Sequence, residues 1–330
     1  MKFAVLGAGA IGAYAGAALA RGGAEVVLIA RGAHLRAMQE SGVEVSSPRG
    51  DFKVAVKATD DVASAADADV VIVALKAYSL PEAAPHLGKI LKPGALTIWA
   101  QNGLPWWYFW NVRGPLQGIR LESVDPGGVI AASIPSKSVV GCVVYCSTEL
   151  AAPGVVRHIE GTRFALGEPD GSAGERLGPV SEAFAAGGLK APVDRRLRDQ
   201  IWLKLVGNAA FNPVTALTGA TLGELGSQTE MLELLEAIFA ECAAVAERLG
   251  VEFPVPLERR LEAGIAVGDH KTSMLQDLEA GKPLELECMT GAIVELGELL
   301  GVAVPHTRAV HACAKLLEAT RSRGQQQFDS

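Results

Sequence analysis

A glycine-rich turn near the N-terminus constrains the fold of this chain more than any other feature. Residues 7–12 read G-A-G-A-I-G, directly after a β-like run over residues 3–6 and before a run of small residues that ends at Gly22. The order strand, G-x-G-x-x-G, helix is typical of the loop that holds a dinucleotide pyrophosphate at a helix N-terminus. We therefore predict a cofactor-binding loop, formed by Gly7, Gly9, Ala10, Ile11 and Gly12.

The residue after the second predicted strand indicates which dinucleotide binds. Residues 25–30 form that strand, and Arg31 follows it. An NAD site usually has an acid here for the ribose 2′-hydroxyl, whereas an arginine matches a 2′-phosphate in charge and geometry. The alternative is an incidental surface arginine. The sequence favours NADP over NAD.

Two further strands end in polar residues. Residues 69–75 and 95–100 read as buried strands, followed by Lys76 and by Gln101-Asn102-Gly103. The carboxyl ends of parallel strands face the ligand crevice of an open α/β sheet. We predict that Lys76 contacts cofactor phosphate and that Asn102 faces a ligand. A solvated loop lysine and an ordinary Asn-Gly turn are the alternatives.

The pattern of the chain changes near residue 194. Residues 139–145 and 155–166 read as antiparallel strands joined through Pro153-Gly154, and helical periods follow from Asp194 onward. At 330 residues the chain is long enough for two cores. We predict an α/β protein with an N-terminal Rossmann-type dinucleotide-binding domain (1–193) and an all-helical C-terminal domain (194–330) for substrate binding and dimerisation.

A polar stripe crosses the first helix of the C-terminal half. Lys204, Asn208 and Asn212 are each four residues apart within residues 202–213, whose other members are mostly apolar. A solvated face is the common reading of such a stripe, but unpaired burial would cost several kcal/mol, so we expect these groups to face a cleft. Pro213 predicts a kink or a stop directly after the stripe.

Two later segments carry candidate ligand-binding groups. Ser273, with Gln276 three residues later, fits a capping box, and a serine at a helix N-terminus is also well placed to hold a carboxylate. Residues 285–300 predict a helix that Glu285 opens. His306 and His311 have no spacing typical of metal ligands, and we predict no metal site.

The composition disfavours some kinds of binding partner. The formal net charge of −7 disfavours nucleic acid or an anionic membrane as the main partner, and no apolar stretch is long enough to span a bilayer. Five irregularly spaced cysteines do not form a disulfide framework, which favours a reducing, cytoplasmic location. The apolar helices of the C-terminal half are compatible with a homodimer.

These motifs together resemble the ketopantoate reductases (2-dehydropantoate 2-reductases), over nearly the whole chain. The resemblance rests on the glycine loop, Arg31, Lys76, residues 101–103, the Lys204 helix, residues 272–277 and Glu285. It implies reduction of a small 2-keto acid, ketopantoate, to (R)-pantoate by NADPH, a step in making pantothenate and coenzyme A.

The resemblance also implies individual roles. Lys204 corresponds to the catalytic lysine and general acid, and Glu285 to a catalytic glutamate that contacts this lysine and the cofactor. The substrate-binding positions correspond to Asn102, Asn208, Asn212 and Ser273. Arg31 and Lys76 correspond to contacts of the cofactor phosphates, and Asn102 to an amide near the nicotinamide.

The chain departs from the family pattern at two places. Residues 105–110 read P-W-W-Y-F-W within an insert that extends to about Gly128, and they suit a lid, a pocket wall or a subunit contact. His270 stands where an amide is commoner. The insert motivates an alternative function, reduction of another branched or aromatic 2-keto acid. A non-catalytic NADP-binding sensor is the alternative from a different class.

Overall fold

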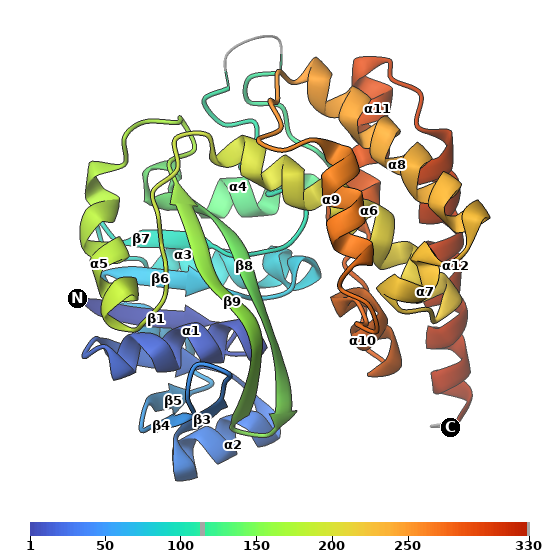
Figure 1. The fold of residues 1–330 in the computed structure, drawn as a ribbon. Coiled ribbons are helices and arrows are strands. Elements are labelled where there is room, and N and C mark those ends of the chain that lie inside the picture. The colour runs from blue at the N-terminus through green and yellow to red at the C-terminus, as the bar shows by residue number, and fades with distance from the viewer. Residues whose placement is uncertain (113–115, 329–330) are drawn as a thin grey trace. The chain divides into compact units, whose positions relative to one another are not determined.

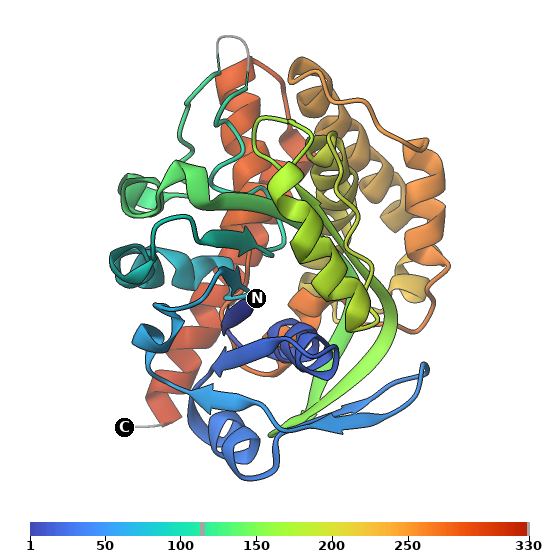
Figure 2. The same ribbon diagram turned by 90° about the vertical axis from the view of Figure 1, so that its left-hand side faces the viewer.

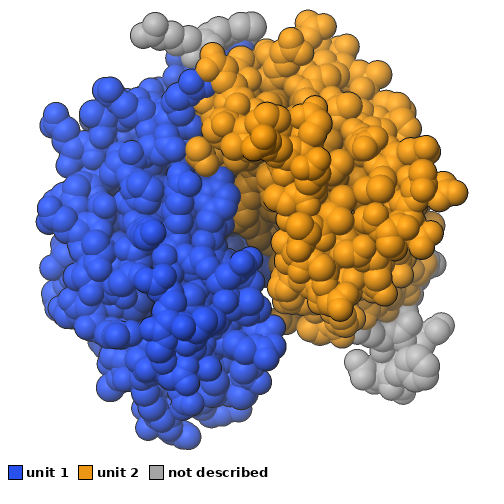
Figure 3. Space-filling model, viewed as in Figure 1, with its two compact units in different colours: residues 1–101, 105–120, 125–197 blue, residues 102–104, 121–124, 198–330 orange. Residues whose placement is uncertain are grey.

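The computed structural model describes residues 1–112 and 116–328 of the chain, which divides into two compact units (Figure 3). The first comprises Met1–Gln101, Pro105–Arg120 and Asp125–Leu197, and the second Asn102–Leu104, Leu121–Val124 and Arg198–Ser330. The first unit is α/β and the second is helical, as the sequence predicts. The predicted division at residue 193 differs from this partition chiefly because two short segments near residues 102 and 121 belong to the helical unit.

A mixed sheet forms the centre of the first unit (Figure 1). Its order is β4-β3-β9-β8-β7-β6-β1-β2-β5. The strands are β1 (Lys2–Leu6), β2 (Glu25–Ile29), β3 (Val43–Ser46), β4 (Phe52–Val54), β5 (Lys57–Thr59), β6 (Val70–Val73), β7 (Leu96–Trp99), β8 (Val139–Ala152) and β9 (Val155–Gly167). β1 pairs in parallel with β2 on one side and with β6 on the other, so the strand order reverses beside β1. Such a reversal is where open α/β sheets bind ligands.

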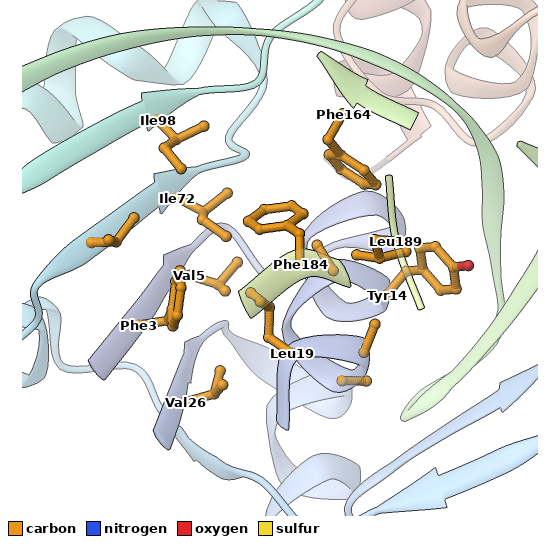
Figure 4. Packing of buried hydrophobic residues seen from close by; sticks show 14 of the residues in the cluster. Phe3, Val5, Tyr14, Leu19, Val26, Ile72, Ile98, Phe164, Phe184 and Leu189 are labelled. Carbon is orange, nitrogen blue, oxygen red and sulfur yellow. The ribbon is translucent and has the colours of Figure 1, made fainter. Parts of the chain in front are cut away.

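Helices of the first unit pack against this sheet. They are α1 (Ala10–Arg21), α2 (Gly32–Ser41), α3 (Leu80–Ile90), α4 (Val129–Ser133) and α5 (Gly178–Ala186). Figure 4 shows the core that results: Leu19 of α1 and Phe184 of α5 lie over Val5 and Ile72 of the strands. The small residues of α1 permit this packing, because a side chain at Gly16 would collide with Leu28 of β2.

A long antiparallel hairpin extends the sheet, as predicted, but β3 and β4 lie beyond it at the edge. β8 and β9 run side by side in both views and turn at Pro153-Gly154 (Figures 1 and 2). Gly154 has φ +78°, a conformation that favours glycine. β3 and β4 are joined by a turn in which the Gly50 amide donates to the Ser47 carbonyl over 2.9 Å.

The aromatic run of the insert lies in the interior. Trp106 packs edge-on against Trp99 of β7 at 4.9 Å between ring centroids and against Trp110 at 4.7 Å. The neighbouring Trp107 and Phe109 are also buried. Burial of this kind contradicts an exposed lid or a subunit contact. Residues 113–115 of the insert lie outside the described residues.

The second unit is built from helices around α8. They are α6 (Leu197–Thr218, whose first residue belongs to the first unit), α7 (Leu222–Gly226), α8 (Thr229–Arg248), α9 (Leu257–Ile265), α10 (Ser273–Glu279), α11 (Ala292–Leu300) and α12 (Pro305–Phe328). A π-helical turn, Glu287–Gly291, leads directly into α11. Among the described helices, none is long and apolar enough to cross a membrane.

Three local predictions in this unit need correction. Of the kink or stop predicted at Pro213, the stop is wrong: α6 continues to Thr218, because Val214 and Ala216 are buried and the Thr215 hydroxyl donates to the Asn212 carbonyl over 2.9 Å. The helix predicted over residues 285–300 begins instead with the π turn at Glu287. Thr272, not Ser273, caps α10, since its hydroxyl accepts the Leu275 amide at 3.3 Å.

Candidate active site and cofactor-binding loop

The glycine loop between β1 and α1 has the geometry that a phosphate-binding turn requires. Gly7 has φ +93°, and a Cβ there would lie 2.8 Å from the Leu75 amide. A Cβ at Gly12 would lie 2.3 Å from the Gly7 carbonyl oxygen, so this glycine permits the turn to close on α1. A Cβ at Gly9 would meet no protein atom within 4 Å. The space at Gly9 therefore faces away from protein and is open to a ligand.

A pocket of about 760 Å³ opens in front of this loop, within the first unit. Of the predicted cofactor residues, Gly7, Gly9 and Arg31 line it. The others are not among the described residues that line it: Ala10, Ile11, Gly12 and Lys76 of the first unit, and Asn102 and Glu285 of the second. Ala10 and Ile11 instead begin α1, whose N-cap at Gly9 has no side-chain hydrogen bond. The pocket size is in the range of small-molecule and cofactor sites.

Arg31 lies at the far end of β2, where the sequence predicts it. It is the exposed N-cap residue of α2 and lines the pocket. Asp60 and Asp61, which follow β5, also line the pocket, and Asp61 accepts the Ala63 amide at 2.8 Å. The pocket lining thus contains an arginine and two acids.

His34, in the first turn of α2, also lines this pocket. Its Nδ1 accepts the Gly154 amide over 2.9 Å, so in the neutral ring the proton sits on Nε2. Nε2 is buried without a partner that meets hydrogen-bond geometry. Burial lowers the pKa of His34, and the nearby Ala8 carbonyl opposes this effect only in part. The Ala8 carbonyl is thus the neighbour that the buried Nε2–H faces, and His34 ties the glycine loop to α2 and to the β8–β9 turn.

Several pocket residues carry a signal that our reading of the sequence did not use. Glu82, His86 and Lys89 of α3 all line the pocket. They recur at spacings of four and three, which places them on one helix face. Because α3 follows Lys76 at the end of a strand, the spacing of these three residues predicts a helix face that lines the ligand crevice.

In the second unit, the structure brings Lys204 and Asn102 together. Lys204 Nζ of α6 donates to Asn102 Oδ1 over 2.8 Å, although the residues are 102 apart in sequence. An ammonium group has three donors and no acceptor, so the amide oxygen faces the lysine. The other two N–H bonds of the Lys204 ammonium point away from the Asn102 oxygen. The half-buried ammonium is thus held in a fixed direction.

The other predicted site residues of this unit occupy varied environments. Asn208 is half-buried, while Asn212 is buried and its amide nitrogen lies 3.6 Å from the Met289 sulfur. Ser273 is exposed at the first residue of α10, and Glu285 is buried just before the π turn. His270 is half-buried, and its carbonyl accepts the Leu222 amide.

Two family models match this chain. Residues 3–171 match the family model described as "Ketopantoate reductase PanE/ApbA", and residues 196–318 match its C-terminal counterpart. Together the two models account for most of the chain.

Individual relatives match over nearly their full lengths. A 2-dehydropantoate 2-reductase of Mesorhizobium japonicum is 42% identical over 97% of this chain and 99% of the relative. A crystal structure of a candidate ketopantoate reductase from Ralstonia solanacearum is 38% identical with a TM-score of 0.90, over 97% and 98% of the two chains. A PanE/ApbA family ketopantoate reductase from Ralstonia eutropha is 30% identical with a TM-score of 0.85, over 98% and 100%. The chain belongs to the ketopantoate reductase family.

Proposed function

We propose that this protein reduces ketopantoate to (R)-pantoate with NADPH. The observation that carries the proposal is the Lys204–Asn102 hydrogen bond, because it orients an ammonium group as a reductase of ketones requires. Membership of the family and the glycine loop with Arg31 support it.

The residues of the first unit fit NADPH. The first-turn amides of α1 and the open space at Gly9 suit the pyrophosphate, and Arg31 suits the 2′-phosphate. When bound, NADPH supplies the hydride. The chain itself provides placement and charge.

Lys204 supplies the proton in this proposal. As an ammonium it donates a hydrogen bond to the ketone oxygen, and it transfers its proton as that oxygen gains negative charge. Asn102 keeps the Nζ atom in place through the 2.8 Å hydrogen bond. We assign Glu285 to holding Lys204, Ser273 to the substrate carboxylate, and Asn208 with Asn212 to the distal hydroxyl. Lys76 is assigned to cofactor phosphate.

The alternative function, reduction of another 2-keto acid, now depends on the aromatic insert acting as a pocket wall. It rested on the aromatic insert, but Trp106 and Trp107 pack into the interior of the first unit. The non-catalytic sensor predicts NADPH binding without turnover, and Lys204 held by Asn102 has no evident use in such a protein.

The deciding experiment follows NADPH oxidation with ketopantoate, in parallel with NADH and with a panel of other 2-keto acids. Ketopantoate turnover that prefers NADPH is the expected result. Arg31→Ala should weaken NADPH binding about 10- to 100-fold, as for one lost charged hydrogen bond, and leave NADH unchanged. Arg36→Ala, an exposed arginine of α2 outside the pocket, is the matched control. Tight NADPH binding without turnover of any keto acid would support the sensor instead.

A homodimer and a cytoplasmic location complete the proposal. Light scattering of the purified protein tests the first, and a mass of one chain would refute it. Fractionation of the native cell tests the second.

A further inference from the structure

The π turn of the second unit lies against the segment that carries Asn102. In this turn the Gly291 amide donates to the Leu286 carbonyl over 3.1 Å, five residues back instead of the usual four. Such turns are rare in helices and frequently occur at functional sites.

Cys288, inside the π turn, contacts the two residues that flank Gly103, Asn102 and Leu104. Its carbonyl accepts the Leu104 amide over 2.7 Å. Its Sγ lies 3.6 Å from the Asn102 carbonyl oxygen, which it can reach as a weak S–H donor. A second acceptor, the Glu285 carbonyl, lies at the same distance from Sγ. Cys288 thus links the backbone of Asn102 to that of Glu285.

Gly103 makes this close approach feasible. It has φ +83°, and a Cβ there would lie 2.4 Å from the Cys288 carbonyl oxygen and 2.7 Å from its sulfur. A side chain at residue 103 would therefore push residues 102–104 off the π turn. The Asn102 side chain, one residue away, would then lose its direction toward Lys204.

We propose that the π turn is a positioning element for the active site, and that Cys288 acts in it as a positioning residue. Cys288 fixes the backbone of Asn102, and Asn102 Oδ1 in turn fixes Lys204 Nζ at 2.8 Å. The thiol is buried, with 4% exposure, so its contribution is the contact and not its reactivity. The kinetic consequence rests on the proposed function, whereas the chain of contacts does not.

Cys288→Ala removes the S–H donor and keeps the fold of the turn. We expect kcat for ketopantoate to fall about 2- to 10-fold, as for one weak hydrogen bond, with the KM for NADPH unchanged. Cys288→Ser, which keeps a donor, should recover most of the loss. Cys242→Ala is the matched control, because Cys242 is a buried cysteine of the same unit that lies in α8. It should lower thermal stability without lowering kcat.

A spectroscopic readout separates this proposal from the proposed function. In protein labelled with 15N-lysine, the Lys204 ammonium signal is assigned by its loss in Lys204→Arg. Cys288→Ala and Gly103→Ala should both shift that signal, and Cys242→Ala should not. If wild-type protein fails to turn over ketopantoate, the proposed function fails, and the signal still tests the positioning. The positioning proposal would be overturned if Cys288→Ala left the Lys204 signal unshifted and, where ketopantoate turnover is measurable, left kcat unchanged.

Discussion

Lys204 Nζ and Asn102 Oδ1 lie 2.8 Å apart, which joins the long helix α6 to a short loop segment of the same unit. The hydrogen bond leaves the other two N–H groups of the ammonium with directions set by the first. A flexible lysine side chain is thereby restrained before any ligand binds. This pre-organisation is what a general acid needs to act efficiently.

Replacement of Lys204 should abolish turnover and spare cofactor binding. We expect Lys204→Met to lower kcat by about 100- to 10,000-fold, because the proton donor is lost. NADPH affinity, measured by fluorescence titration, should stay near the wild-type value. Asn102→Ala should cause a smaller loss, about 10-fold, since it leaves the ammonium present but undirected. Equal turnover in Lys204→Met and wild type would remove Lys204 from the mechanism.

The two glycines at positions 9 and 12 should separate ligand binding from stability. A methyl group at Gly9 meets no protein atom, so Gly9→Ala should keep the wild-type Tm but bind NADPH at least about 10-fold more weakly. A methyl group at Gly12 would collide with the Gly7 carbonyl, so Gly12→Ala should lower Tm. Thermal melts with and without NADPH measure both effects. Equal NADPH affinity in Gly9→Ala and wild type would argue against a phosphate at this position.

His34 should make stability depend on pH. Burial lowers its pKa in the folded protein, so below the ordinary value of 6.5 the unfolded chain binds a proton that the folded chain does not. Stability should therefore fall as pH drops below 6.5. His34→Gln cannot titrate and its oxygen can still accept the Gly154 amide, so its Tm should fall less over the same range. His86→Gln, an exposed histidine of the same pocket, should follow the wild-type curve.

Glu241 of α8 gives the stability of the protein a second dependence on pH, in a more acidic range than that of His34. Its carboxylate accepts the backbone amides of His306 and Thr307, each over 2.8 Å, at the start of α12. Burial is the largest single influence on this carboxyl and acts to raise its pKa. The hydrogen bonds from Thr307 and His306 together outweigh burial and hold the pKa below the ordinary value of 4.5.

Because the folded pKa is lowered, the stabilisation from Glu241 is present above pH 4.5 and is lost as pH falls through the folded value. Glu241→Gln should cost about 1–3 kcal/mol of unfolding free energy at neutral pH and less in acid. Urea unfolding at several pH values measures this. The exposed Glu236 of the same helix gives the control, Glu236→Gln, which should be near neutral at every pH.

The sequence predicted the fold well wherever local chemistry decides the structure. The glycine loop, Arg31 at the end of β2 and the β8–β9 hairpin depend on residues close together in the chain. The polar stripe could be predicted for the same reason, since helical spacing places Lys204, Asn208 and Asn212 on one face of a helix.

The remaining features depend on contacts between distant residues. Pro213 favours a stop, but the burial of the turn that follows outweighs this local preference. The π turn at Glu287 has no sequence signature, and the hydroxyl of Thr272, which caps α10, also lies 2.6 Å from that of the distant Thr215. The ring of His34 is held by the amide of Gly154, 120 residues away, a contact that local sequence cannot predict.

The membership of Asn102 in the helical unit limits how this enzyme can be recombined. A chimera that joins residues 1–197 of this chain to the helices of another family member would take Lys204 and its partner amide from different parents. The segments Asn102–Leu104 and Leu121–Val124 would have to travel with the helices, although they are encoded inside the other half of the gene. Selection on the two halves is therefore coupled at these few positions, and exchange of whole halves between relatives should succeed mainly where these two segments already agree.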